Sequence, residues 1–403
     1  MVALGLIPEA RGTRVLGVAT LVNALGNGLF AVSSVLFFTR SIGLSVATVG
    51  LGLTVAEGIG LVAGLPAGAL GDRIGQRLAY QGLLAVQALT MVLFVFVHTF
   101  WFFLVVAALY ATGQKAARAA NNALIAHTAG EDRVRVRGYL RSVNNLGMSL
   151  GALAGGLALS VDTRQGYVLL MLADAATFCG ATALISRLPG TGGERTGPPP
   201  PRGWPALRDR PYLLLTATNG VLSLQYFVLT LGLPLWVAER TTAPHWVVSV
   251  LLALNTALVA LVQVRAGRPV RDVKSAVTYL RRAGAVLLLG TALFALSGSL
   301  PTWGAVVLLL LGVVVHTLGE LWHAAAAFEL SFGLAAPGAT AQYQSVFNLG
   351  MGGAEFLAPV IVTTVCLGLG GWGWLALGAV FAATGALAGP VADRAERRQR
   401  VPL

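Results

Sequence analysis

The sequence has little charge for its length. Asp, Glu, Lys and Arg make up 11% of its 403 residues, whereas roughly 25% is usual in soluble domains. Only two residues are lysine and only two are cysteine, Cys179 and Cys366. The low charge excludes a chain of ordinary soluble domains. Two cysteines inside apolar stretches give neither a disulfide framework nor a metal site.

The sequence also lacks the motifs of nucleotide and acyl chemistry. It contains no glycine-rich loop with a lysine to hold phosphates, and no nucleophile elbow. No loop between apolar stretches is long enough to form a catalytic domain. We therefore predict that the protein is not an enzyme and uses no cofactor or metal. A membrane enzyme acting on a lipid-linked substrate is the alternative from another functional class.

Long apolar runs are abundant instead. Hydrophobic residues make up 56% of the chain, and its mean hydropathy is +0.75. Apolar runs of about 20 residues recur throughout, which is the length a helix needs to cross a bilayer. No stretch alternates as a β-barrel strand does, so we expect helices. The sequence predicts an all-α membrane protein with twelve transmembrane helices, at about 14–38, 46–70, 78–98, 101–125, 138–160, 166–188, 212–238, 244–265, 276–299, 302–328, 341–367 and 371–390.

The basic residues are unevenly distributed. The formal net charge is +12. If both termini are cytoplasmic, about 25 of the 28 Lys and Arg residues lie on the cytoplasmic side, whereas Arg40, Arg164 and Arg240 do not. This is the positive-inside bias of membrane proteins, and it explains the charge without a nucleic-acid partner. We predict a monomeric, multi-pass protein of the cell (inner) membrane with both termini cytoplasmic and its basic surface on the anionic side of the bilayer.

The chain reads as two related halves. The phrase SVNNLGM (Ser142–Met148) recurs as SVFNLGM (Ser345–Met351), 203 positions later. The stretch 189–211 is rich in Pro, Gly and Arg and favours a stiff, extended linker. We predict a six-helix bundle at 1–188, this segment as a cytoplasmic linker, and a second six-helix bundle at 212–403, with pseudo-two-fold symmetry. Chance similarity between two glycine-rich helices is the alternative.

One loop carries a family motif. The stretch GALGDRIGQR (Gly68–Arg77) resembles the signature loop of the major facilitator superfamily, although Gln76 replaces a basic residue. The resemblance implies the major facilitator fold, with a loop that docks against helix ends and holds the cytoplasmic side shut in one state. Alternatively, the loop is a basic turn that only sets topology. The loop residues singled out for the conformational role are Gly68, Asp72, Arg73, Gly75 and Arg77.

A glycine stripe follows the first copy of the repeated phrase. Gly147, Gly151 and Gly155 are spaced by four, so they share one helix face and allow a neighbouring helix to approach closely. With Gly156, they resemble the antiporter motif of the drug and proton exchanger branch of the same superfamily. Ala152 stands where that motif has proline. The resemblance favours an exporter over an importer.

Ionisable residues inside the predicted spans are candidates for proton coupling, because charge in hydrocarbon is costly and therefore rare. Glu57 and Glu355 lie near mid-depth. His316, Glu320 and His323 are spaced by four and three, so they share one face of the tenth span. They can carry a proton, bind substrate, or form a structural hydrogen-bonded cluster. A metal site is disfavoured, because one helix cannot easily wrap three ligands around an ion.

Cationic and polar residues lie at the matching depth of the fourth span, namely Gln114, Lys115 and Arg118. The resemblance places the first, fourth, seventh and tenth helices around a central cavity. We therefore hypothesise that Lys115 or Arg118 pairs with Glu320 when the inner side is closed. The alternative is that both cations extend to the inner headgroups.

Neutral polar residues complete the predicted cavity. Asn23 and Asn27 lie four apart in the first span, and Asn219, Gln225 and Tyr226 lie in the seventh. Amides and aromatic rings suit an apolar or mixed ligand, although hydrogen bonds between helices explain them equally well. Many exchangers of the superfamily carry an acid in the first span, and this chain has none there. The site of proton coupling is therefore left open by the sequence.

These features together predict a secondary active transporter that works by alternating access. The partners expected are a small-molecule substrate, protons and the lipid bilayer. We predict proton-coupled efflux of a small amphipathic organic compound, such as a drug. Proton-linked or passive uptake of a small solute is the alternative within transport.

Overall fold

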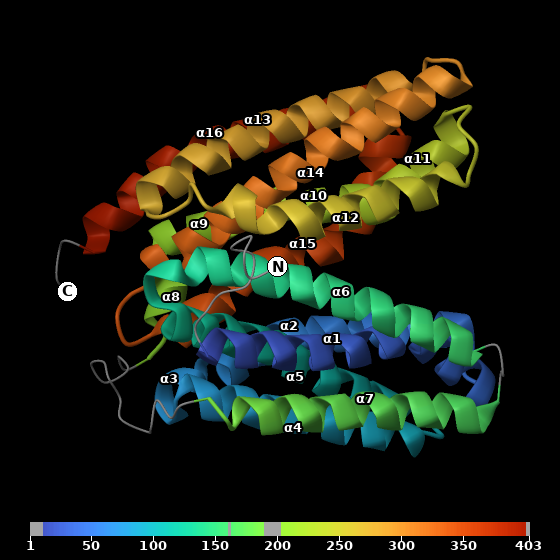
Figure 1. The fold of residues 1–403 in the computed structure, drawn as a ribbon, viewed down its shortest axis with the longest axis vertical. Coiled ribbons are helices and arrows are strands. Elements are labelled where there is room, and N and C mark those ends of the chain that lie inside the picture. Colours follow the sequence, from blue (N-terminus) through green and yellow to red (C-terminus); the bar gives the residue numbers. More distant parts are fainter. Residues whose placement is uncertain (1–10, 160–162, 189–202, 400–403) are drawn as a thin grey trace. The chain divides into compact units, whose positions relative to one another are not determined.

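The computed structural model describes residues 11–159, 163–188 and 203–399, and their regular structure is entirely helical (Figure 1). Eleven helical segments in this part of the chain are long and apolar enough to cross a membrane. The predicted all-α membrane fold is confirmed. The longer helices are α1 (Arg11–Leu36), α2 (Val46–Ala69), α4 (Gln76–Val95), α5 (Phe100–Ala129), α6 (Arg133–Leu159), α7 (Arg164–Ile185), α9 (Arg210–Ser223), α12 (Val247–Gly267), α13 (Val273–Ser297), α14 (Thr302–Gly333), α15 (Thr340–Ile361) and α16 (Gly371–Gln399).

Short helical pieces complete the described elements. Three have π-type hydrogen bonding, and one of them divides the predicted seventh span. Such π segments are uncommon and often mark functional positions in helices. The short elements are η2 (Phe37–Ser41), α3 (Gly71–Ile74), η3 (Gly130–Asp132), α8 (Pro205–Arg208), α10 (Gln225–Phe227), η4 (Val228–Gly232), α11 (Leu233–Arg240) and η5 (Val362–Leu367).

The run predicted at 138–160 is not among the eleven apolar segments. It falls in α6, which is long enough to cross a bilayer with 27 residues. However, α6 opens with RVRVRGYLR and continues with two asparagines, so its first half is polar. Position 160 itself lies outside the described residues. Composition, rather than length, sets α6 apart from the other spans.

The chain forms two compact units. The first contains Met1–Gly203 together with Pro337–Ser345, and the second contains Trp204–Ala336 together with Val346–Leu403. Helix α15 therefore begins in the first unit and continues in the second. Most of the predicted linker lies outside the described residues, so its boundaries stay a prediction.

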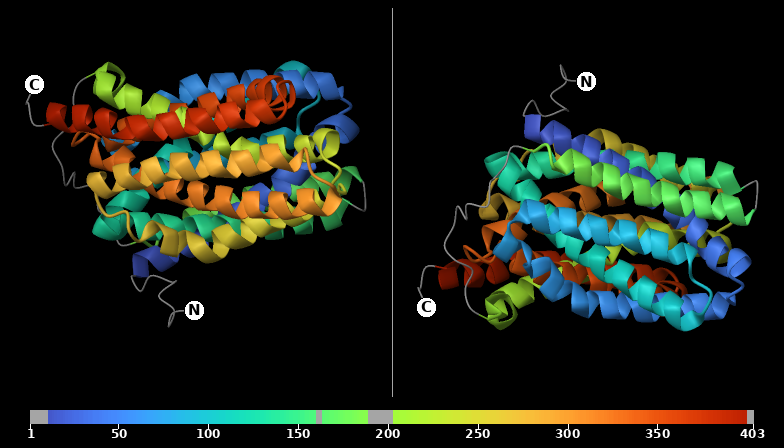
Figure 2. Two further views of the ribbon diagram at one scale, coloured as in Figure 1. Left: turned by 90° about the horizontal axis from the view of Figure 1, so that it is seen from above. Right: turned by 90° about the horizontal axis from the view of Figure 1, so that it is seen from below.

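In the first unit, α1 packs against α6 and α7, α2 against α5, and α4 against α5 and α7. Figure 2 shows these helices running side by side. Phe38 is the centre of an aromatic cluster at one end of the unit. Its ring centroid lies 4.7 Å from that of Phe103 and 5.0 Å from that of Phe94. Edge-to-face contacts of this kind add to the packing of buried rings.

In the second unit, α13 packs against α14 and α16, α12 against α14, and α9 against α16. Trp236, Phe294 and Trp374 form the aromatic core at one end, with neighbouring ring centroids 5.6–5.7 Å apart. The indole nitrogen of Trp236 donates a hydrogen bond to Ser297 Oγ at 3.1 Å. This bond satisfies a polar group that burial would otherwise make costly.

The repeated phrase lies at a close helix crossing in each unit. A Cβ atom added to Gly147 would lie 2.7 Å from Ala24 Cβ in α1. At the equivalent position 203 residues later, a Cβ on Gly350 would lie 3.0 Å from the amide nitrogen of Gly220 in α9. Side chains larger than glycine do not fit at such crossings. The same glycine therefore joins the fifth helix to the first in each repeat.

Three exposed tryptophans mark one end of the second unit. Trp246 directly precedes α12, and Trp303 and Trp372 are the second residues of α14 and α16, three helices that begin at the same end (Figure 1). Exposed indole rings gather at the boundary between hydrocarbon and water. The three rings therefore indicate the level of one membrane surface on this unit.

Candidate functional site

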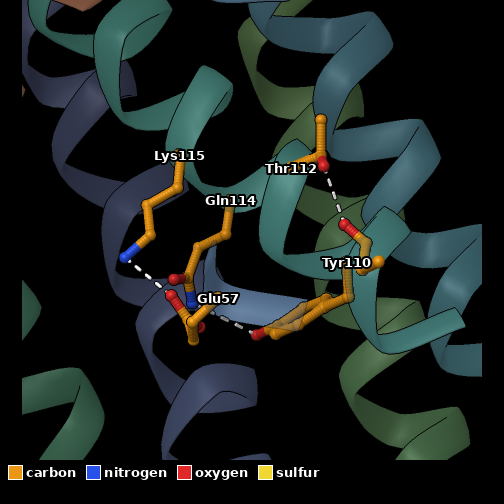
Figure 3. Close-up of polar contacts among 6 residues, drawn as sticks. Glu57, Tyr110, Thr112, Gln114 and Lys115 are labelled. Atoms are coloured by element: carbon orange, nitrogen blue, oxygen red, sulfur yellow. Dashed lines mark hydrogen bonds and ion pairs between the residues drawn. The ribbon is translucent and has the colours of Figure 1, made fainter. Parts of the chain in front are cut away.

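An ion pair lies at mid-helix in the first unit (Figure 3). Lys115 Nζ lies 2.8 Å from Glu57 Oε2. Glu57 is the twelfth of 24 residues in α2, and Lys115 is the sixteenth of 30 in α5. The lysine side chain is 10% exposed and the glutamate side chain is 45% exposed. The two charges thus meet far from both helix ends, with the carboxylate the more accessible partner.

Glycines on α2 allow this pairing. A Cβ on Gly60 would lie 2.7 Å from Ala111 Cβ, and a Cβ on Gly64 would lie 2.9 Å from Lys115 Cβ. Gly60 and Gly64 follow Glu57 by three and seven residues, so all three share one face of the helix. The small residues bring α5 close enough for the lysine to reach the carboxylate.

Further polar side chains of α5 surround the pair. Gln114 Nε2 donates to the Tyr110 hydroxyl at 3.5 Å (Figure 3). Arg118 is half-buried one turn beyond Lys115. The ion pair of Lys115 with Glu57 lies within a single unit, and the sequence did not predict it. The pairing of Lys115 or Arg118 with Glu320 stays a prediction.

The asparagines of α1 lie in the same unit. Asn23 and Asn27 are half-buried, and among the described residues their Oδ1 atoms have no hydrogen-bond partner. Asp174 of α7 is fully buried, contacts α1 at Gly26, and accepts a hydrogen bond from Thr177 Oγ1 at 3.2 Å. A carboxyl group is therefore packed against α1 from a neighbouring helix, although the first span itself has no acid.

In the second unit, the predicted row on α14 is buried. His316, Glu320 and His323 have between 0 and 5% of their surface exposed. His316 Nε2 lies 3.0 Å from the carbonyl oxygen of Gln225, which can only accept, so this nitrogen carries the hydrogen. His323 Nε2 lies 3.2 Å from Asn219 Oδ1. The row thus binds α14 to α9 and α10 along one face.

Asn255 of α12 completes the row, and the sequence analysis missed it. Its Nδ2 donates to Glu320 Oε2 at 3.0 Å and to Thr317 Oγ1 at 2.9 Å. The available signal was an asparagine within the apolar run LLALNTALVALVQV. Polar residues inside such runs usually find partners on adjacent helices.

The three residues of the row have different partners. His316 and His323 bond to different residues of α9 and α10, whereas Glu320 turns to α12. In the part of the chain that the structure describes, no group of three or more His, Cys, Asp or Glu is arranged to hold a metal ion.

One residue of the row and one residue beside it have buried polar atoms that are unsatisfied. Within the described ranges, His316 Nδ1 and both side-chain polar atoms of Gln225 have no hydrogen-bond partner. Unpaired polar atoms are costly when buried, and they commonly mark positions that hold water or a ligand group. Tyr226 lies nearby, with its ring centroid 5.9 Å from that of His323. Amide, imidazole and phenol groups therefore lie together in this unit.

Glu355 differs from the other predicted carboxylates. It is exposed on α15, next to exposed Phe356 and Leu357. The α14 row, by contrast, is buried. A role for Glu355 in proton coupling stays a prediction.

The signature loop folds as a tight connection between α2 and α4. Gly75 has a φ of 90°, a conformation that favours glycine. Asp72 accepts hydrogen bonds from the backbone nitrogens of Ala341 and Gln342, each at 2.8 Å, at the start of α15. Arg77 donates to the carbonyl oxygens of Leu188, at 2.8 Å, and of Ser186.

These bonds stay within the first unit. The carboxylate of Asp72 caps α15 and also lies at the positive end of its dipole. Gly68 lies against Ser345, where a Cβ would overlap the serine side chain. Arg73 is exposed. The loop therefore fixes the beginning of a helix that continues into the second unit.

Replacing Asp72 with Ala should lower the thermal stability of the purified protein. The loss expected is about 1 kcal/mol, the usual value of a helix cap. Asn retains an accepting oxygen, so Asp72→Asn should lose less. Thermal unfolding in detergent measures the change. Asp393→Ala, at an exposed position on α16, is the control and should unfold at the same temperature as the wild type. Equal stability of all three variants would contradict the capping role.

The glycine stripe of α6 faces α1. A Cβ on Gly151 would overlap the carbonyl oxygen of Leu25, and one on Gly155 would lie 3.4 Å from Leu29 Cα. Gly156, by contrast, has open space where a Cβ would be. Three glycines of the motif thus pack against α1, and the fourth does not.

Comparison with known families identifies the chain. The family model described as Major Facilitator Superfamily matches residues 16–359. The chain belongs to the major facilitator superfamily. The match covers most of the chain, including the signature loop, the ion pair and the α14 row. A comparison with curated proteins finds no match.

Solved structures of other superfamily members have the same fold. The human organic anion transporter is 16% identical, with a TM-score of 0.71 over 94% of this chain and 99% of its own. A bacterial homologue of the iron transporter ferroportin is 16% identical, with a TM-score of 0.72 over 96% and 100%. The fucose:proton symporter of E. coli is 13% identical, with a TM-score of 0.67 over 94% and 98%. At these identities the likeness shows the fold alone.

Proposed function

We propose that this superfamily member exports a small amphipathic organic compound by alternating access, in exchange for protons. The ion pair between Glu57 and Lys115 is the observation that carries the proposal. A carboxylate at mid-helix in a membrane protein is costly unless it has a function or a partner. Here it has a partner, and it keeps nearly half of its side chain exposed.

Protonation of Glu57 would break the pair and release Lys115. A charge change of this kind shifts a two-state protein toward the state that accommodates it better. The freed lysine can then take another acceptor, and Glu320 is the one that we predicted. Proton binding at one helix pair would in this way favour a rearrangement of the helices.

The polar groups of the second unit suggest the kind of substrate. Asn219, Gln225 and Tyr226 provide neutral donors and acceptors beside the buried histidines. A compound with an apolar body and a few polar groups would suit these neutral side chains better than a highly charged one.

The direction of transport rests on the glycine stripe. Its packing against α1 and its resemblance to the antiporter motif favour exchange, although Ala152 replaces the proline. Uptake together with protons is the alternative, and a fucose:proton symporter is among the proteins of similar fold. Whichever direction holds, Glu57 is the proposed carrier of the proton.

Reconstitution in liposomes should decide between export and uptake. Protein-containing vesicles are loaded with a panel of amphipathic compounds, and a pH gradient is imposed. We expect solute to move against its own gradient, opposite to the proton flow, and internal pH to change only when a transported compound is present. Empty vesicles and a protonophore are the controls. Movement of solute in the same direction as protons would favour uptake, and solute flux unaffected by pH would contradict proton coupling.

A further inference from the structure

A pocket lies in the second unit where α11 and α13 end and α16 begins. Its volume is about 650 Å³, within the usual range of roughly 300–1,000 Å³ for small-molecule sites. Helix α16, whose first residue Gly371 lines the pocket, is the red helix that runs to the opposite end of the unit (Figure 2). The lining includes Trp236, Glu239, Arg240, Ser299, Gly371 and Trp372.

Two adjacent residues give the pocket both signs of charge. Glu239 and Arg240 are exposed at the end of α11. Arg240 donates one hydrogen bond to the carbonyl oxygen of Leu367 at 2.8 Å, which orients the guanidinium. A guanidinium has five N–H donors and binds phosphate well. A pocket with an oriented cation beside an anion suits a ligand that is itself a zwitterion.

The hydroxyl groups in the wall donate elsewhere. Thr241 Oγ1 donates to Val237 O at 3.0 Å, and Ser299 Oγ donates to Leu296 O at 2.9 Å. Their hydrogens are therefore engaged with the backbone. Glu239 and Arg240 are therefore the groups of the pocket that can bind a ligand most strongly.

The pocket lies at the level of the membrane surface. Trp372, in its wall, is 79% exposed, and it is the second residue of α16 as Trp303 is of α14. Exposed tryptophan marks the interface between headgroups and acyl chains. Leu296, also in the wall, and Leu369 beside it are exposed too. Exposed apolar side chains thus lie at and beside the charged pocket.

We propose that the pocket binds the headgroup of a membrane phospholipid that carries both a phosphate and a primary ammonium group, as phosphatidylethanolamine does. Arg240 holds the phosphate, and Glu239 holds the ammonium. The acyl chains lie along Trp372 and the exposed leucines. An anionic phospholipid satisfies Arg240 but is repelled by Glu239, and a choline headgroup offers no N–H donor to the carboxylate. This site does not depend on the transported compound or on the direction of transport.

Native mass spectrometry of the purified full-length protein tests the proposal. Phosphatidylethanolamine, phosphatidylcholine and phosphatidylglycerol with identical acyl chains are added separately in detergent. The wild type should retain one phosphatidylethanolamine in preference to the other two. Arg240→Gln should weaken that binding by about tenfold or more, because it removes a charge-assisted hydrogen bond. Glu239→Gln should instead abolish the preference over phosphatidylglycerol.

Control variants separate binding from folding. Arg164→Gln removes an exposed arginine at the start of α7, outside the pocket, and should bind lipid as the wild type does. If Arg240→Gln does not fold, Arg240→Lys takes its place in the test. It keeps the positive charge and should retain the preference for phosphatidylethanolamine. Equal retention of the three lipids by the wild type would overturn the proposal. So would unchanged binding in the folded Arg240→Gln protein, or displacement of the lipid by equimolar free phosphoethanolamine, which would indicate a soluble ligand.

Discussion

Glu57→Gln should uncouple transport from the pH gradient without stopping substrate exchange. Glutamine is close in shape to a protonated glutamate but cannot release a proton. The variant therefore stays permanently in the neutral form that, in our proposal, the proton creates. Gradient-driven transport should fall by at least about tenfold, which corresponds to a free-energy difference of about 1.4 kcal/mol. Counterflow of labelled against unlabelled substrate, with equal pH on both sides, should continue.

Two further variants sharpen this test. Lys115→Gln removes the cation that lies 2.8 Å from Glu57. The variant should lose both gradient-driven transport and thermal stability, because the carboxylate is left at mid-helix without this cation. Asp393→Asn neutralises an exposed carboxylate far along α16 and should transport normally. If Glu57→Gln retains pH-driven transport while folded, Glu57 is not the proton carrier, and buried Asp174 becomes the next residue to test.

Gly151→Ala should severely destabilise the protein, whereas Gly156→Ala should not. The new Cβ at position 151 would overlap the backbone of α1 at Leu25, which no side-chain rotation can relieve. Overpacking usually costs about 1–3 kcal/mol, occasionally more, and we expect the upper end or beyond. At position 156 the Cβ enters open space, and alanine is the better helix former by about 1 kcal/mol.

The second unit allows the same comparison between a tightly packed glycine and a glycine with open space. Gly350→Ala should destabilise, because its Cβ would meet α9 at Gly220, whereas Gly353→Ala has open space. Thermal unfolding in detergent, followed by the amount of monodisperse protein on a sizing column, measures all four variants. Equal melting temperatures within each pair would show that neither crossing is as tight as the structure has it.

Several elements of the fold were readable from the sequence. The lengths of the apolar runs predicted the helices, because the thickness of hydrocarbon imposes that length on any spanning helix. The loop Gly68–Arg77 indicated the superfamily that the family model later matched. The polar beginning of α6 was the exception, because a run of sufficient length can still be too polar to resemble a span.

The candidate site was readable only in part. The spacing of His316, Glu320 and His323 placed them on one face, since helix geometry fixes which residues align. It did not predict Asn255 as the partner of Glu320, nor that Glu355 is exposed while the α14 row is buried. Both depend on how each helix is rotated about its own axis, and a nearly uniform apolar sequence has no strong period to set that rotation.

By itself, the sequence determined that this chain is helical, spans a membrane, repeats a glycine crossing in its two halves, and carries a few costly charges in its interior. Only the tertiary structure decided which charges meet. Glu57 and Lys115 are 58 positions apart and on different helices, and they pair because Gly60 and Gly64 let α2 and α5 approach each other. The physical reason is the distance along the sequence over which each interaction acts. Helix formation and membrane insertion depend on local composition, whereas an ion pair between helices depends on packing that brings distant residues together.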